Sequence, residues 1–207
     1  MAEIPVLLLA AGASSRMGQP KQLLPCGNNT LIEHQVHSLK KIQNPIFVIL
    51  GSNSDSIIPL IEKQGVQIIV NDTWEMGLGN SIACGLKHVL REMPDLQAVL
   101  IVLLDQPFIS VNHFRRMISE FRPGIQQIIV SASQTGWRGV PALFDRCYFD
   151  DLEGLNGDSG AKKIIEQNLN FVTAIICEEC LDDIDTPESY KRNLEKFMNS
   201  SGSNFTT

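Results

Sequence analysis

Short apolar runs alternate with helix-type patterns along most of this chain, and this alternation limits the available folds more than any other feature. The expected strands are residues 4–9, 45–50, 66–70, 97–104, 127–132 and 170–177. Runs that are apolar throughout are typical of parallel strands buried on both faces, and helices supply the crossovers between such strands. We therefore predict an α/β fold of three layers, with a mostly parallel central sheet and helices on both faces.

Several helix starts carry capping signals. The spacing of Thr30 and Glu33 is that of a capping box and predicts a helix through about Lys41. Further helices are expected over residues 55–64, from about residue 80 to 93, after residue 110 and from residue 187 onward. The residues expected to cap the last three are Asn80 or Ser81, Ser110, and Thr186, with Pro187 in the first helical position.

The length and charge of the chain argue against several classes of function. A chain of 207 residues fits one domain, which we expect at residues 1–198, with a flexible tail at 199–207. The formal net charge of −6 argues against nucleic acid or a membrane surface as a partner. No apolar run approaches the roughly 18 residues of a membrane span, and the N-terminus has no signal-peptide pattern. The five cysteines, an odd number, fit a reducing compartment, so we expect a cytoplasmic protein.

The loop after the first strand has the composition of an anion-binding site. Residues 10–15 are Ala, Gly and Ser, so their backbone N–H groups can close on an oxyanion, and Arg16 and Lys21 add two cations. The alternative is an ordinary strand-to-helix turn with two solvated bases. Neither the P-loop spacing nor G-x-G-x-x-G is present, which argues against kinase-type and dinucleotide-binding loops.

Polar residues follow several of the expected strands. Asp105 comes directly after the most apolar run, where it suits either a turn or a cation. Asp185 lies just outside the last helix, and the helix dipole explains the acidic cluster around it but not its position. Asn71 stands at the C-terminal end of the third strand, the edge at which open α/β sheets bind ligands. Gly79 and Ser81 belong to a glycine turn that suits either a helix start or the edge of a base.

Together these residues resemble the signature of the MobA-like NTP transferases, and most of all that of the molybdenum cofactor cytidylyltransferases. The matching elements are L-A-A-G-x-x-x-R-M-G-x-x-K at residues 9–21, G-x-P-x-L-F at 139–144, G-D-x-G at 157–160 and D-x-D-T-P at 183–187. The resemblance covers nearly the whole chain up to the tail. It implies the Rossmann-like fold of the nucleotide-diphospho-sugar transferases and an Mg²⁺-dependent nucleotidyltransferase reaction.

The resemblance also implies roles for individual residues. The catalytic residues would be Arg16, Lys21 and Asp105. The nucleotide-binding residues would be Leu9, Ala10, Ala11, Gly12, Lys21, Asn71, Gly79 and Ser81. The metal ligands would be Asp105 and Asp185, and the acceptor-binding residues Arg138, Pro141 and Asp158. Judged without the resemblance, Arg138 is equally well a solvated loop arginine, and for Asp158 a helix cap is the default expectation.

The reaction that the resemblance implies is transfer of CMP from CTP to the phosphate of molybdopterin cofactor, with release of pyrophosphate. In this family L-A-A-G accompanies CTP and L-A-G-G accompanies GTP, and the methyl group of Ala11 would crowd a purine. Within the same class, the acceptor could be a sugar phosphate or the donor GTP. Two alternatives come from other classes. One is a non-catalytic accessory protein in transient contact with a molybdenum hydroxylase. The other is an NAD(P)-linked oxidoreductase, against which the missing dinucleotide glycine pattern argues.

Overall fold

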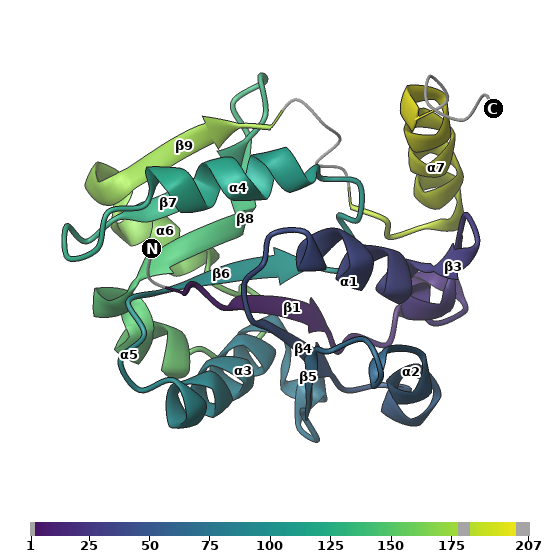
Figure 1. Ribbon diagram of the computed structural model, residues 1–207, viewed down its shortest axis with the longest axis horizontal. Helices are drawn as coiled ribbons and strands as arrows, with labels where there is room; N and C mark the ends of the chain where they lie inside the picture. The colour runs from purple at the N-terminus through teal and green to yellow at the C-terminus, as the bar shows by residue number, and fades with distance from the viewer. Residues whose placement is uncertain (1–2, 178–182, 202–207) are drawn as a thin grey trace.

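A computed structural model describes residues 3–177 and 183–201 of the chain, with side chains through residue 195. Within this part, the centre of the molecule is a seven-stranded sheet in the order β5-β4-β1-β6-β8-β7-β9 (Figure 1). The strands are β1 (Val6–Ala10), β4 (Ile46–Leu50), β5 (Gln67–Val70), β6 (Ala98–Leu103), β7 (Ile128–Ala132), β8 (Arg138–Asp145) and β9 (Val172–Ile176). Strands β5, β4, β1 and β6 are parallel, as are β7 and β9, while β8 is antiparallel to both its neighbours. This sheet confirms the predicted mostly parallel α/β architecture.

Helices cover both faces of the sheet and complete the three predicted layers (Figure 1). They are α1 (Leu31–Lys40), α2 (Ser54–Ile61), α3 (Leu78–Glu92), α4 (Val111–Glu120), α5 (Phe149–Glu153), α6 (Lys162–Gln167) and α7 (Pro187–Ser201). Because neighbouring residues of a strand point to opposite faces, Val6 and Leu8 of β1 join the core under α1, α2 and α4. Leu7 and Leu9 join the core under α3, α5 and α6.

Strand β8 is the strand of the central sheet that the sequence does not predict. Its composition argues against a strand, since it contains Gly139 and Pro141, and Pro lacks the N–H that a central strand uses. The structure accommodates Pro141 where the pairing of β7 with β8 shifts register between Val130 and Ser131. Paired residues resume at Ala142, which lies opposite Val130 on one side and Ile101 on the other. With this shift, β8 pairs with β6 on one side and with β7 on the other. It thereby connects the parallel strands β5, β4, β1 and β6 to the parallel strands β7 and β9.

The helix starts are partly as predicted. The capping box of Thr30 and Glu33 is present, and Ser110 caps α4. The predicted cap of α3 is wrong, because this helix begins at Leu78 with Gly77 as its N-cap and no side-chain cap. Helix α6 likewise begins behind Ala161 without a side-chain cap, so Asp158 does not cap it.

The C-terminal region also departs from the predicted boundary. Thr186 accepts a hydrogen bond from the backbone N–H of Ser189, which confirms the cap of α7. The expected boundary at residue 198 falls inside α7, which continues through Ser201, and the rest of the expected tail lies outside the described residues. Among the helices described, none combines the length and apolar character of a membrane span.

Candidate active site

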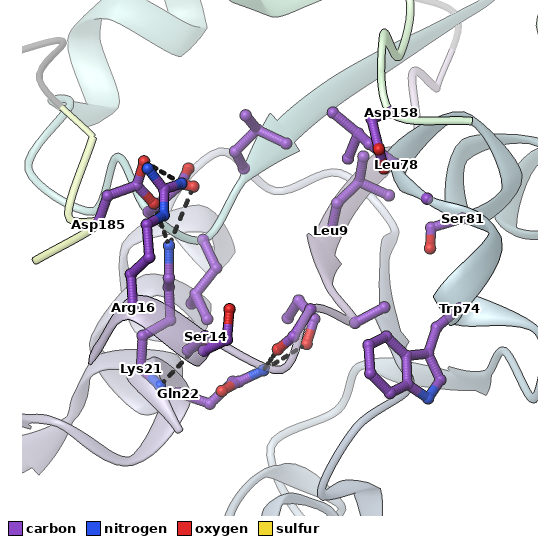
Figure 2. Close-up of a pocket in the computed structure, with 18 of the residues that line it drawn as sticks. Leu9, Ser14, Arg16, Lys21, Gln22, Trp74, Leu78, Ser81, Asp158 and Asp185 are labelled. Atoms are coloured by element: carbon purple, nitrogen blue, oxygen red, sulfur yellow. Dashed lines mark hydrogen bonds and ion pairs between the residues drawn. The ribbon is translucent and has the colours of Figure 1, made fainter. Parts of the chain in front are cut away.

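A cavity of about 380 Å³ opens at the carboxyl edge of the sheet, where β1 and β6 end side by side. Its lining comes from the end of β1 and the loop behind it, the end of β6, the turn before α3, and two later segments around residues 158 and 185. Figure 2 shows Arg16, Lys21 and Asp185 on one side of this cavity and Trp74 and Ser81 on the other. The carboxyl edge is where open α/β sheets bind their ligands, so this cavity is the candidate active site.

The loop after β1 is held by side chains of the following 3₁₀ turns. Gln22 is buried and donates from Nε2 to the carbonyl oxygen of Ala10 at 2.7 Å and to that of Gly12 at 3.0 Å. Ser14 accepts a hydrogen bond from the backbone N–H of Lys21 at 3.1 Å. These bonds fix the loop without any ligand, and such preorganisation is what makes backbone donors effective toward an anion.

Four charged side chains meet at one end of the cavity, which we call the charged end: Arg16, Lys21, Asp105 and Asp185. Lys21 Nζ lies 3.3 Å from Asp105 Oδ2 and 3.0 Å from Asp185 Oδ1. Arg16 Nη2 lies 2.9 Å from Asp185 Oδ2 (Figure 2). Two aspartates that are far apart in the sequence therefore share one lysine, as the sequence analysis requires.

Main-chain contacts bring the two aspartates together. Asp105 follows β6, and its carbonyl oxygen accepts a hydrogen bond from the backbone N–H of Ile184 at 2.9 Å. Ile184 is fully buried in the core, which anchors the segment that carries Asp185. The backbone N–H of Asp185 donates to Ser189 Oγ at 3.0 Å, so the first turn of α7 fixes the other side of this segment.

Burial dominates the electrostatics of the carboxylates around β6. It raises the pKa of Asp105, and the opposing effect of Lys21 is smaller. Burial, together with the charge of Asp105, also raises the pKa of Asp183 to about 6. The carboxylate of Asp183 accepts a hydrogen bond from Gln106 Nε2 at 2.9 Å. A single ammonium group thus compensates only part of the negative charge gathered here.

The charged end has donor atoms that a divalent metal could use. Asp105 Oδ1 is buried and has no hydrogen-bond partner among the described residues, which a buried carboxylate oxygen rarely lacks. Among these same residues, no cluster of three or more His, Cys, Asp or Glu side chains is placed to hold a metal. Two carboxylates are nevertheless what Mg²⁺ commonly takes from a protein, since phosphates and water complete its octahedron. Asp105 and Asp185 therefore fit a metal that arrives with a nucleotide.

The opposite end of the cavity, which we call the loop end, consists of Trp74, Glu75, Gly77, Leu78, Ser81 and Asp158. Figure 2 shows Trp74, Leu78, Ser81 and Asp158 at this end. It combines an aromatic and an aliphatic side chain with two carboxylates and, among the described residues, has no cation. The Trp74 side chain fits because its neighbour is Gly51, where a Cβ atom would lie 2.5 Å from Trp74 Cβ and Cγ. The two ends together suit an amphipathic ligand with an anionic part and a planar or apolar part.

Two loops from different parts of the chain form the loop end. The backbone N–H of Gly79 donates to the carbonyl oxygen of Gly157 at 2.8 Å, and that of Gly157 donates to the carbonyl oxygen of Met76 at 2.9 Å. Gly77 has φ +99°, and a Cβ atom there would lie 2.5 Å from Asp158 Oδ1. Glycine is thus needed at residue 77 for both its backbone conformation and its close contact.

The structure brings most of the predicted site residues into the lining of this one cavity. These are Leu9, Ala10, Ala11, Gly12, Arg16, Lys21, Ser81, Asp105, Asp158 and Asp185. Four others, Asn71, Gly79, Arg138 and Pro141, lie outside the lining.

Asn71 and Gly79 support the wall behind the cavity. Asn71 is buried and donates from Nδ2 to Asn80 Oδ1 at 2.9 Å and Ser81 Oγ at 3.1 Å. Gly79 packs on the backbone of Asn156. Arg138 is exposed at the start of β8, whereas Pro141 is buried in that strand.

Gln22 and Trp74 are among the site residues to which the sequence assigns no role. Gln22 fixes the loop after β1. The sequence feature that could have indicated this role is an amide side chain directly after Lys21 in an otherwise apolar stretch. Trp74 lies in the segment expected near a base, and its signal is a large aromatic residue shortly after a strand end.

Comparisons with known proteins agree with this geometry. The profile of the family described as "MobA-like NTP transferase domain" matches residues 6–171. A relative in Paenarthrobacter nicotinovorans, named "Nicotine blue oxidoreductase", is 31% identical over 199 residues, which are 91% of this chain and 95% of the relative. The "Purine catabolism protein PucB" of Bacillus subtilis is 29% identical, over 89% of this chain and 92% of that protein.

Solved structures show the same fold. The crystal structure of Rv0371c from Mycobacterium tuberculosis H37Rv superposes with a TM-score of 0.82 at 28% identity, covering 94% of this chain and 98% of that one. A manganese complex of Rv0371c has a TM-score of 0.76 at 26% identity and covers 94% of this chain and 99% of that one. A nucleotidyl transferase from Methanothermobacter, with a TM-score of 0.82 at 20% identity over 96% and 99% of the two chains, shows the fold alone.

Proposed function

This chain belongs to the MobA-like NTP transferase domain family, and from that premise we propose that it transfers CMP from CTP to the phosphate of molybdopterin cofactor, releasing pyrophosphate. The nucleotidyltransferase class follows from the family, and CTP and the molybdopterin acceptor are the finer proposal. The proposal also includes a cytoplasmic location for the reaction and delivery of its product to a molybdenum hydroxylase. The free thiols of Cys26, Cys84 and Cys147 are compatible with a reducing compartment.

The observation that carries the proposal is the position of Lys21 Nζ between Asp105 and Asp185 at one end of a cavity whose other end presents Trp74 and Leu78. A nucleoside triphosphate has the same polarity, with anionic phosphates at one end and a flat base at the other. The cations and the fixed loop after β1 would receive the phosphates at the charged end. The base would then extend toward Trp74 and Leu78 at the loop end.

The side chains of the charged end account for the chemistry. Lys21 and Arg16 stabilise the negative charge that develops on the α-phosphate and on the leaving pyrophosphate. The acceptor needs no general base, because a phosphate monoester is already ionised near neutral pH. Asp105 and Asp185 would hold Mg²⁺, which supplies charge neutralisation and a template for the two phosphates when it is bound. The manganese complex of the 26% identical Rv0371c supports use of a divalent metal.

The choice of CTP rests on Ala11. Ala11 lines the cavity and is buried, and we expect its methyl group to limit the space beside the base. One methyl group typically separates ligands by about 1–3 kcal/mol, enough to favour a pyrimidine over a purine. On the acceptor side, Arg138 and Pro141 stay proposals, since both residues lie outside the cavity lining.

Pyrophosphate release tests this function directly. The protein is incubated with Mg²⁺, one of CTP, GTP, UTP or ATP, and either molybdopterin cofactor or a sugar phosphate. We expect release with CTP and molybdopterin cofactor, and its loss in Asp105→Asn with the fold retained. Release with a sugar phosphate or GTP would redefine the substrates. No release with any pair would contradict the enzyme and favour an accessory protein.

The name of the Paenarthrobacter relative favours testing a second candidate, a redox reaction with NAD(P)H. The loop after β1 lacks the glycine pattern of dinucleotide-binding folds. Nicotinamide fluorescence on mixing separates the two functions. A quench or shift that saturates would support the redox candidate, and an unchanged spectrum would remove it.

A further inference from the structure

Asp158 and Glu75 are the acidic side chains of the loop end, and the surroundings of Asp158 favour a nucleoside ligand. Its loop is joined to the turn before α3 by the two hydrogen bonds of Gly157 with Met76 and Gly79. Its Oδ1 atom lies directly over Gly77, the N-cap of α3. In Figure 2 Asp158 lies beside Leu78, across the cavity from Arg16 and Asp185.

The Asp158 carboxylate has no partner of its own. Among the described residues, none donates a hydrogen bond to it or forms an ion pair with it, and the two cations of the cavity belong to the charged end. The N-terminus of α3 provides a favourable field for the negative charge. Both acceptor oxygens are therefore available to a ligand that offers N–H donors.

The main-chain bonds also determine which ligand group Asp158 can meet. Because residues 76–79 and 157 are bonded backbone to backbone, Asp158 moves with the turn that carries Leu78 and leads to Ser81. If the phosphates occupy the charged end, the group that reaches this turn is the base. A carboxylate accepts a hydrogen bond from the amino group of cytosine, whereas it faces the O4 acceptor of uracil with repulsion.

On the basis of the proposed function, we infer that Asp158 is a specificity-determining residue that accepts a hydrogen bond from the exocyclic amino group of the base, and so selects CTP over UTP. This places Asp158 in the nucleotide site and not in the acceptor site to which its motif assigns it. CTP has an amino donor where UTP has the O4 acceptor, so the inference can be tested by comparing the binding of these two nucleotides.

The test measures the affinities of CTP and UTP by calorimetry in the presence of Mg²⁺ and without any acceptor. For the wild-type protein we expect CTP to bind about 10-fold tighter than UTP or better. In Asp158→Asn the ratio should fall about 10-fold, because an amide can donate to O4 of uracil. Asp158→Ala should weaken CTP toward the affinity of UTP, and melting curves show that each variant is folded.

Asp151→Asn is the matched control, since Asp151 is exposed on α5 and outside the cavity lining. It should keep the wild-type ratio. An unchanged ratio in Asp158→Asn, or an equal loss of both affinities, would overturn the inference. Because no turnover is measured, selective CTP binding without pyrophosphate release in the function assay would overturn the proposed function alone.

Discussion

The two ends of the cavity are built by different means. The charged end depends on side chains: the contacts of Lys21 and Arg16 with Asp105 and Asp185 are ion pairs at 2.9–3.3 Å. The loop end depends on the main chain, where two backbone hydrogen bonds and the glycine contact at residue 77 join loops from different parts of the sequence. Ion pairs can exchange partners when a charged ligand or metal arrives, whereas backbone pairing at a glycine has little freedom to adjust. We therefore expect the charged end to rearrange and the loop end to stay fixed.

Removal of the central cation should give the largest effect. In Lys21→Met, we expect kcat for pyrophosphate release to fall about 10²–10³-fold, because the protein loses the cation that stabilises the charge developing on the phosphates. Lys63→Met, at an exposed position after α2, is the matched control and should keep its activity. Retention of more than about a tenth of the wild-type kcat would show that the charged end does not depend on Lys21.

The loop end should instead fail through its backbone. Gly77→Ala should lower the free energy of unfolding by about 3 kcal/mol, for two reasons. The alanine would have to adopt a φ of +99°, and its Cβ atom would lie 2.5 Å from the carbonyl carbon of Gly157. Gly65→Ala is the control, since Gly65 also has a positive φ of +72° but nothing within 4 Å of a Cβ atom. It should cost about 1 kcal/mol, and urea unfolding with an unchanged m-value measures both. Equal costs would show that the contact with the second loop is unimportant.

The same difference explains how much of the molecule the sequence predicts. The place of Asp105 at the carboxyl edge is predictable, because it comes directly after a buried strand and the topology then brings the end of β6 beside β1. Its role as a metal ligand comes only from the family resemblance, because a turn explains the residue equally well. The pairing of Gly157 with Met76 and Gly79 is not predictable, because backbone hydrogen bonds between distant loops leave no pattern of side chains. Strand β8 is missed for a related reason: Pro141 is tolerated only because of a register shift set by tertiary structure.

The aromatic wall provides an intermediate effect. In Trp74→Ala, we expect the Kd of the nucleotide to rise about 10-fold, since stacking of a base on an aromatic side chain contributes about 1–3 kcal/mol. Trp74→Phe should recover most of the affinity, and kcat at saturating nucleotide should stay near the wild-type value. Trp137→Ala is the control, because Trp137 is exposed and outside the cavity lining. A fall in kcat without a change in Kd would show that Trp74 acts on the chemical step, like the residues of the charged end, and not on nucleotide binding.

The smallest expected effect is a pH dependence of stability that arises at Asp183, beside the charged end and away from the loop end. Because burial raises the pKa of Asp183 from its ordinary value near 3.8 to about 6, the folded chain holds this proton more tightly than the unfolded chain. Without added metal, stability should therefore fall as the pH rises from about 4 to 6, by about 1 kcal/mol or less, because solvent screens this partly exposed group. Urea unfolding at several pH values should show a flatter profile for Asp183→Asn and an unchanged one for the exposed control Asp95→Asn. An equally steep profile for Asp183→Asn and for the wild-type protein would show that another group is responsible for the pH dependence.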